Sequence, residues 1–357
     1  MKRARLSFGG LGVLAALGAA SAFAGCKQVD DSAFAGTVPT KETVAIVLPG
    51  GTTTTNSSLT VGGVTTKKSA LLGDVAADYA TTVAVTTIIN GSVGAVLDLV
   101  KTVVSYPATD VEGETAVWGP HTDPLSANTW RLTVTRVAPH VFHWQFDGKG
   151  KTADDSTFVT ILSGQHTQSL DAKGHAMEGF GSGNFTLDWD AADTLPQHDT
   201  NVGQAAFTYS RLDPSATVTV DVTFTGIKDN CDPTSPKCKT SGQIFNAVYA
   251  YVATPGNGGD LQYAATEDFD HVDGSSLKET LSLHSRWQET GAGRTDVEAA
   301  GGDYGATINT SSECWDSNFA SVFSVASYAP TDTTLNWGAE STCAFPTAVL
   351  ASLPPPS

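Results

Sequence analysis

Basic residues are scarce in this sequence: 20 Lys and Arg stand against 37 Asp and Glu, which gives a formal net charge of −17 over 357 residues. Nucleic acids and anionic lipid surfaces are bound through basic surface, so this balance argues against both as partners. The negative charge favours solubility but identifies no partner. Because 40% of the residues are hydrophobic, we expect a globular body with a large core.

Cysteine is also sparse, with five in the chain. No C-x-x-C motif occurs and no histidine lies near a cysteine in the sequence, which argues against a structural zinc site. The cysteines after Cys26 form an even set, and outside the cytosol such a set indicates disulfides. We favour the pairs Cys231–Cys238, across a turn-rich loop, and Cys314–Cys343. Loop-closure entropy predicts contributions of roughly 2.5 and 3.5 kcal/mol.

Long hydrophobic runs are missing as well. The longest, Leu11–Ala24, is too short for a helix that spans a ~30 Å hydrocarbon core, which takes about 20 apolar residues. Basic residues precede this run, and the small pair Ala24-Gly25 follows it. A basic start, a short apolar run and small residues at the cut are typical of a secretory signal. Residues 1–25 are therefore predicted to be removed on export.

The residues at the end of this signal are Phe23-Ala24-Gly25-Cys26. They resemble the lipobox of bacterial lipoproteins, with Phe23 where Leu is usual. The resemblance implies that the thiol of Cys26 is diacylated and that the protein is tethered to the cell envelope by lipid. Lys27 replaces the Asp that signals inner-membrane retention, which favours the outer membrane. The alternative is an ordinary secretory cut after Ala22-Phe23-Ala24, which would release a soluble secreted or periplasmic protein.

Composition divides the exported chain into three segments. Residues 26–68 are rich in Gly and Thr, which predicts a flexible tether. Residues 69–107 carry apolar residues at helical spacing in two runs, separated by Asn90-Gly91, and we expect a helical hairpin that packs on the rest of the protein. Residues 108–357 are expected to form an antiparallel β domain with the two disulfides.

The β pattern is clearest in residues 217–225, where Val218, Val220, Val222 and Phe224 alternate with polar residues. This period predicts a strand with one buried face and one solvated face. Similar runs, separated by turn signals, predict further strands at 130–137, 141–146, 158–165, 176–189, 205–212, 245–253, 261–269 and 277–287. Consecutive strands imply a meander, and a sheet of this size usually curls or closes to hide its edges. The predicted fold is mainly β: a large curled antiparallel sheet or partly open barrel.

Patterns for metal binding are weak. Asp268, Asp270 and Asp273 precede Gly274, and carboxylates on a tight loop can converge on calcium. The spacing is not that of an EF-hand, so a solvated hairpin turn is the favoured interpretation. His140 and His143 form the closest histidine pair, but side chains three apart on a strand point to opposite faces. We predict no metal and no cofactor.

A carboxylate pair beside an aromatic residue gives a weak case for catalysis. If Asp188 and Asp190 lie on one strand they share a face about 7 Å apart, a separation compatible with glycoside hydrolysis. Exposed strands of acidic proteins carry such pairs routinely, so the chain is expected to be non-catalytic. The string Gly179–Gly183 matches no nucleotide or nucleophile motif and indicates a bend or a close neighbour.

Arginine is informative in a chain so poor in bases. Arg286 and Arg294 lie near Cys314 in the sequence. A guanidinium there can hold an anionic ligand, or it can pair with carboxylates and brace the end of the sheet beside the disulfide. Bracing is the favoured interpretation, and anion binding is the alternative.

The expected order of elements, a tether, helices and a large sheet, is similar to that of the half-barrel lipid carriers of bacterial envelopes. By that likeness the helices would cover a cavity for a lipid or another hydrophobic ligand. The predicted function is a lipid-anchored envelope protein that binds a hydrophobic or anionic ligand or an envelope partner. The alternatives are a structural or interaction lipoprotein without a small ligand, and a secreted carbohydrate hydrolase.

Overall fold

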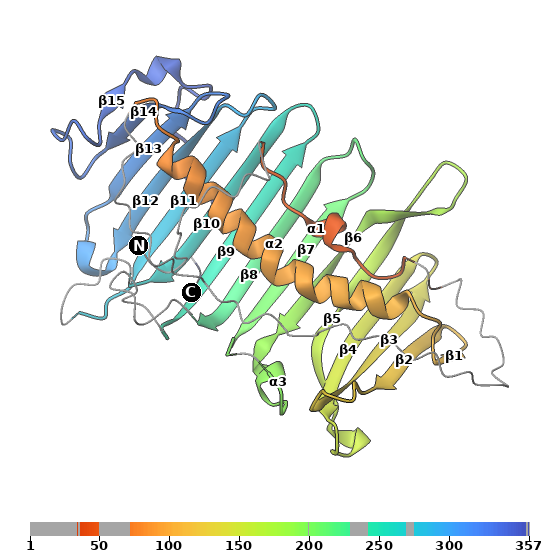
Figure 1. The fold of residues 1–357 in the computed structure, drawn as a ribbon. Coiled ribbons are helices and arrows are strands. Elements are labelled where there is room, and N and C mark those ends of the chain that lie inside the picture. Colours follow the sequence, from red (N-terminus) through yellow and green to blue (C-terminus); the bar gives the residue numbers. More distant parts are fainter. Residues whose placement is uncertain are drawn as a thin grey trace.

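The computed structural model describes Phe34 and residues 36–49, 72–198, 200–228, 242–268, 275–354 and 356. Within these residues fifteen strands form one antiparallel sheet, and each strand pairs with the next one along the chain (Figure 1). The mainly β fold and the meander are therefore confirmed. The sheet is not closed into a barrel, because β1 and β15 form its two separate edges.

The strands are β1 (Asp110–Glu112), β2 (Thr115–His121), β3 (Asn128–Ala138), β4 (Val141–Gly150), β5 (Val159–Leu170), β6 (Ala176–Asp188), β7 (Gln204–Arg211), β8 (Val218–Lys228), β9 (Ile244–Thr254), β10 (Gly258–Glu267), β11 (Glu279–Trp287), β12 (Gly293–Gly301), β13 (Asn309–Trp315), β14 (Ser321–Ala326) and β15 (Trp337–Gly338). The helices are α1 (Lys41–Val44), α2 (Ala77–Val104) and α3 (Trp189–Asp193), with short 3-10 turns at η2 (Asp155–Thr157), η3 (Gly302–Tyr304) and η4 (Glu340–Thr342).

The two faces of the sheet differ in polarity because side chains alternate along each strand. One face, here called the helix face, carries lateral rows of large apolar residues. A central row of buried side chains runs through Trp144, Phe185, Phe207, Val222, Tyr249, Tyr263 and Leu283. The opposite face, here called the polar face, carries the Thr, Ser, Asn, Gln and Asp side chains that alternate with these apolar residues along the same strands.

Helix α2 covers the helix face. Its 28 residues extend about 42 Å, and Figure 1 shows it crossing the strands from the β13 side to the β2 side. Val85, Ile89, Leu97 and Val100 form its buried stripe and belong to the same core as the sheet. Each such side chain contributes about 1.5–3 kcal/mol through burial, so the helix is a main source of the core's stability.

The expected helical hairpin is not confirmed, because α2 continues without interruption through Asn90 and Gly91. The Asn90 side chain finds partners outside the helix: its Oδ1 accepts the Ile46 N–H at 2.9 Å, and its Nδ2 donates to the Ile46 carbonyl at 2.8 Å. A glycine inside a helix costs about 1 kcal/mol relative to Ala. The buried stripe continues on both sides of Gly91, and its burial stabilises the helix by more than this cost.

An N-terminal segment, residues 36–49, lies beside α2 on the helix face (Figure 1). Besides Asn90 at Ile46, four other side chains bind its backbone. In order along the segment these are Gln168 at Gly36, Arg211 at Glu42, Tyr251 at Val47 and Tyr79 at Pro49. Phe34 packs edge-on against Trp118 and Phe142. The described part of the predicted tether is thus seated on the sheet. None of the described helices has both the length and the hydrophobicity to span a bilayer.

The Asn90 side chain joins α2 to the N-terminal segment, so its removal should destabilise the packing of both elements. We expect Asn90→Ala to lower the free energy of unfolding by about 1–3 kcal/mol, because the Ile46 amide loses its partner in a partly buried position. Thr87→Ala is the matched control, since Thr87 is exposed and bonds only within its own helix. Urea unfolding measures the free energy of unfolding of both variants. Equal losses in the two variants would show that the contact between Asn90 and Ile46 does not matter.

Candidate functional site

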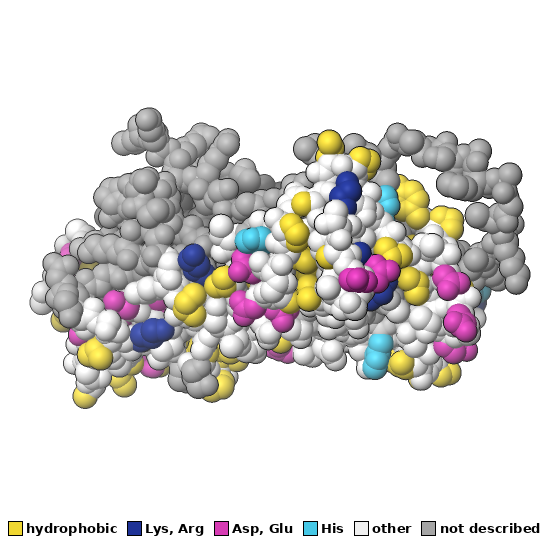
Figure 2. All heavy atoms as spheres, turned by 90° about the horizontal axis from the view of Figure 1, so that it is seen from below, with side chains coloured by type: hydrophobic (Ala, Val, Ile, Leu, Met, Phe, Trp, Pro, Cys, Tyr) yellow, Lys and Arg dark blue, Asp and Glu magenta, His cyan; other side chains and the backbone are white. Residues whose placement is uncertain are grey.

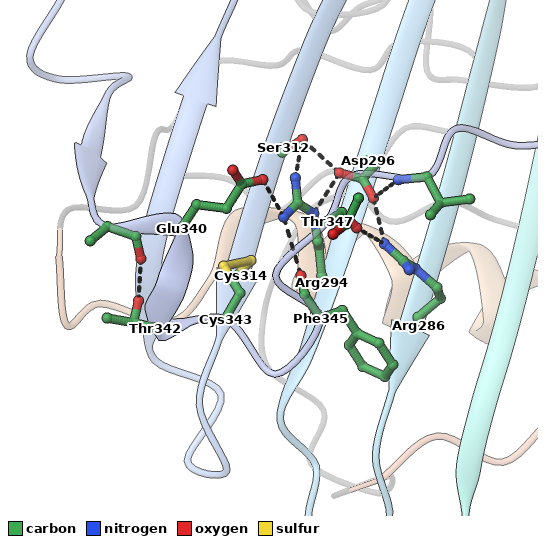
Figure 3. Close-up of a disulfide and its surroundings, with 12 residues drawn as sticks. Arg286, Arg294, Asp296, Ser312, Cys314, Glu340, Thr342, Cys343, Phe345 and Thr347 are labelled. Atoms are coloured by element: carbon green, nitrogen blue, oxygen red, sulfur yellow. Dashed lines mark hydrogen bonds and ion pairs between the residues drawn. A yellow bond between two sulfur atoms is a disulfide. The ribbon is translucent and has the colours of Figure 1, made fainter.

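The C-terminal segment, residues 339–354 and 356, crosses the polar face of β10–β13 and is here called the C-terminal strap. The disulfide Cys314–Cys343 attaches its start to β13, with 5.6 Å between the Cα atoms (Figure 3). This pairing confirms the prediction from the sequence. By loop-closure entropy, a loop with a sequence separation of 29 residues contributes about 3.5 kcal/mol.

Arg294, on β12, lies under the strap with only 1% of its side chain exposed. Its Nε donates to Asp296 Oδ1 at 2.7 Å, and its Nη1 donates to Glu340 Oε1 at 2.7 Å. Its Nη2 donates to Ser312 Oγ, and Nη1 also reaches the Phe345 carbonyl. One guanidinium therefore connects two strands of the sheet to two points on the strap (Figure 3).

Arg286, on β11, completes this brace. Its Nη2 donates to Asp296 Oδ2 and to the Thr347 carbonyl, each at 2.9 Å. Asp296 is fully buried, and its Oδ2 also accepts the Val349 N–H. The two guanidinium charges are matched by the carboxylates of Asp296 and Glu340. The arrangement is that of carboxylate-paired arginines bracing the end of the sheet.

Hydrogen bonds from β10 and β11 hold the rest of the strap. His284 lies within 2.8 Å of the Val349 carbonyl through Nδ1 and within 2.7 Å of Asp260 through Nε2. Gln262 Oε1 accepts the Ser352 N–H at 2.7 Å. Most of these contacts join a sheet side chain to a strap backbone atom, so the strap is bound mainly through its main chain.

The helix face of the same strands carries a second polar cluster, where α2 begins. Glu313, on β13, is 3% exposed, and its Oε2 accepts the backbone N–H of Asp78 at 2.7 Å. The Glu313 carboxylate therefore satisfies one of the amides that a helix leaves unpaired in its first turn. Asp78 itself is partly buried in that turn. We call these two residues the acid pair.

The pKa values of both members of the acid pair are raised. Burial raises the pKa of Glu313, and the Asp78 amide partly offsets this. Burial also raises the pKa of Asp78 well above its ordinary value, and the charges of Glu313 and Asp296 add to the effect. Burial and a nearby negative charge both disfavour the ionised form of a carboxyl group.

Hydroxyl groups extend this cluster toward the centre of the sheet. Thr82 Oγ1 on α2 lies 2.5 Å from Ser285 Oγ, which lies 2.5 Å from Thr295 Oγ1 on the next strand. Thr295 pairs in register with Glu313. The first turns of α2 thus rest on hydroxyl and carboxyl groups, whereas its later turns rest on apolar side chains.

Aromatic packing and backbone bonds secure the start of α2. Tyr79 stacks on Phe319 with 4.3 Å between ring centroids and also contacts Trp315 at 5.6 Å. Residues 73–76 bond to the backbone of 319–321 just before β14. The beginning of the helix is therefore docked by contacts on several sides of the acid pair.

The other predicted residues have structural roles or lie outside the described chain. Asp188 caps α3 through the Ala191 N–H, and Asp190, already inside α3, accepts the Gly203 N–H at 2.7 Å. They do not share a strand face, because β6 ends at Asp188. Asp268 is buried just after β10. The remaining predicted residues, Cys26, Cys231, Cys238, Asp270 and Asp273, lie outside the described residues.

The glycine string Gly179–Gly183 lies in β6 and makes room for a buried pair. A Cβ at Gly181 would meet the His166 ring at 2.5 Å, and one at Gly183 would meet the Tyr209 hydroxyl at 2.8 Å. His166 Nδ1 lies 2.8 Å from that hydroxyl, and burial lowers the pKa of His166 to about 4. The neutral pair belongs to the core. The described residues hold no group of three or more His, Cys, Asp or Glu side chains suited to a metal ion.

The acid pair was not among the residues predicted from the sequence. Asp78 and Glu313 are 235 positions apart, and no spacing motif connects them. Glu313 itself gives one weak indication. It is a charged residue that directly precedes Cys314 and Trp315 in β13, and all three are buried.

Comparisons with known proteins return nothing: no family model, curated protein or solved structure matches this chain.

The brace makes a quantitative prediction. Arg294→Met should lower the free energy of unfolding by about 3 kcal/mol, because Glu340 and the strap lose their partner and Asp296 keeps only Arg286. Arg136→Met is the control, since its ion pair with Glu114 is exposed and should contribute little to stability. Urea unfolding of both variants gives the comparison. A loss no larger for Arg294 than for Arg136 would contradict the proposed bracing.

Proposed function

We propose that this chain is a lipid-anchored protein of the cell envelope that acts by binding a protein partner, without catalysis. Support for the anchor comes from the lipobox-like residues that end at Cys26. Support for a binding role comes from the exposed polar face of the central strands. The hydrophobic ligand expected from the sequence has less support, because the helix face is already covered by the protein's own chain.

The helix face is occupied by the protein's own chain. Leu97 and Val100 of α2 are fully buried against the sheet, and Val44, Ile46 and Leu48 of the N-terminal segment are buried beside them. In a lipid carrier, that face would hold the ligand. Here the helix and the N-terminal segment take its place and complete the core.

The polar face of the central strands carries the proposal. Thr208, Asp221, Thr223 and Thr225 are exposed on β7 and β8, and Asn184 continues the row on β6. Antiparallel sheets commonly leave one face to water, so polarity alone names no partner. The strap shows how this face can bind an extended chain. Side chains on β10 and β11 hold carbonyl and amide groups of the strap's backbone.

Charge and anchor position agree with a role at the envelope. Lys and Arg side chains are few on the side of the molecule seen in Figure 2, where acidic and uncharged ones predominate. The described fold begins at Phe34, so the eight residues from Cys26 allow a separation of at most about 28 Å between anchor and sheet. An anchor on Cys26 would therefore keep the protein close to the membrane.

Lipid attachment is tested directly. The wild-type protein, expressed with its signal in a Gram-negative host, should incorporate labelled palmitate and partition into the detergent phase, because Cys26 carries the acyl chains. Cys26→Ser should do neither, whereas the control Cys343→Ser should keep the label. An unlabelled wild-type protein whose mature N-terminus is Gly25 would contradict the anchor and support ordinary secretion.

The absence of a small ligand is tested on the soluble Cys26→Ser protein purified from the periplasm without detergent. Native mass spectrometry should give the mass of the bare chain, because α2 occupies the helix face. A discrete adduct that leaves with organic solvent would instead establish a hydrophobic ligand and overturn the proposal that the protein acts only through a protein partner.

A further inference from the structure

We propose that the strap is an internal ligand and that the sheet surface under it is a binding site for an extended, uncharged segment of a partner protein. This surface, here called the strap site, consists of the side chains on β10–β12 that hold the strap, which are Gln262, Thr266, His284, Arg286, Arg294 and Asp296. The inference rests on the proposed function in one respect, because it takes the partner to be a protein.

The first observation is that the strap site binds the main chain of the strap. Its side chains bond to the carbonyl groups of Phe345, Thr347, Val349 and Pro356 and to the N–H groups of Val349 and Ser352, at 2.7–3.2 Å. The first three carbonyls belong to alternate residues, which is the spacing of an extended chain. Because every residue except proline offers the same N–H and C=O groups, a segment of another sequence can make these bonds.

The second observation is that the strap's own side chains contribute little to its attachment. Residues 346–350 are all exposed, and Val349 and Leu350 leave 44% and 40% of their surface to solvent. Phe345 differs, because the centroid of its ring lies 5.1 Å from Arg286 Cζ, and a cation over an aromatic ring is attracted to it. The strap site therefore prefers an aromatic residue at this one position.

The third observation is that the strap does not satisfy every donor of the site. Arg286 Nε is buried and has no hydrogen-bond partner among the described residues. A buried donor without an acceptor is unfavourable, especially on a charged group. A partner segment that places a carbonyl or hydroxyl oxygen beside this atom would make one bond more than the strap makes.

Charge determines which kind of segment fits. From Ala344 to Pro356 the strap carries no ionisable side chain. The guanidinium groups under it are already matched, because Arg286 and Arg294 pair with Asp296 and Glu340. A carboxylate or an ammonium group brought to this surface would break one of these pairs or stay unpaired itself. The ligand class is therefore an extended peptide segment without charged side chains.

The strap is attached in a way that allows its exchange for such a segment. The disulfide fixes Cys343 to β13, and none of the described residues after Cys343 belongs to the hydrophobic core. Segments without core contacts open at a lower free energy than the fold as a whole. The strap can therefore leave while the sheet and the disulfide remain. Because it stays tethered, it competes at a high effective concentration, and a partner segment must displace it.

Peptide binding to a full-length variant with a weakened strap tests the proposal. Val349→Pro with Ser352→Pro removes the two strap N–H groups that the site accepts and changes no residue of the strap site. The probe is a fluorescent peptide with the sequence of residues 344–354, and fluorescence anisotropy gives its dissociation constant. The peptide should bind this variant about tenfold more tightly than the wild type, because the weakened strap competes less.

Matched peptides and a site variant show whether the main chain is bound. The peptide with Val349→Pro and Ser352→Pro should bind about tenfold more weakly, because it lacks the same two N–H groups. The peptide with Val349→Thr and Leu350→Ser should bind within about threefold of the original, since these side chains are exposed in the strap. Adding Arg286→Met to the weakened-strap protein should abolish binding, and Gln262→Ala replaces it if that variant does not fold.

Three results would overturn the proposal. The first is an absence of peptide binding to the weakened-strap protein, and the second is equal binding of the original peptide and its proline-substituted form. The third is a dimer of the weakened-strap protein that the peptide dissociates, which would assign the site to the strap of a second copy. The proposed function fails separately, because an extractable adduct in the native mass spectrum overturns it whatever the peptide does.

Discussion

The structure depends on the packing of one long helix against the apolar face of an open sheet. A fifteen-stranded meander that never closes must cover its hydrophobic rows in some other way. Helix α2 crosses the strands and supplies Val85, Ile89, Leu97 and Val100 to the core. Residues 36–49 lie beside it and extend the cover. Without these two elements, rows of aromatic side chains from β4 to β11 would face water.

Polar contacts fix this cover at the start and in the middle of α2. At the start of α2, Glu313 caps the helix and the Thr82–Ser285–Thr295 hydroxyl chain supports it. In the middle of α2, Asn90 binds the backbone of the N-terminal segment. On the opposite face the strap, with its disulfide and arginine brace, holds β10–β13 together. Strands β10–β13 thus carry a docked segment on both faces, and the acid pair lies at β13.

Local patterns in the sequence predicted the parts of the fold that local physics determines. The alternation from Val218 to Phe224 predicted β8 and its buried face correctly. Cys314–Cys343 was one of the two pairs favoured from the even cysteine count, and the structure confirms it. The predicted break at Asn90-Gly91 is not confirmed. The Asn90 side chain bonds to the backbone of Ile46, which is distant in the sequence, and local helix propensity takes no account of such a contact. Asp188 and Asp190 were interpreted as one strand face, but β6 ends at Asp188, which caps α3, and Asp190 lies inside that helix.

The acid pair and the arginine brace show why the candidate sites were harder to predict. Arg294 was recognised as notable, yet its partner Glu340 comes from the strap, 46 positions away. Asp78 and Glu313 meet only because α2 starts over β13. Such clusters are products of the register of the whole sheet, and their chemistry becomes visible only when the strands are in place.

The most direct test of the account is amide exchange, resolved residue by residue, through the middle of α2. If a single helix covers the sheet, the amides from Val85 to Val100 should be protected continuously, including those next to Asn90 and Gly91, at a level close to that of the central strands. Rapid exchange confined to residues 90–93, with protected amides on both sides, would instead indicate two helices in a hairpin. That result would contradict the continuous cover on which the rest of the account depends.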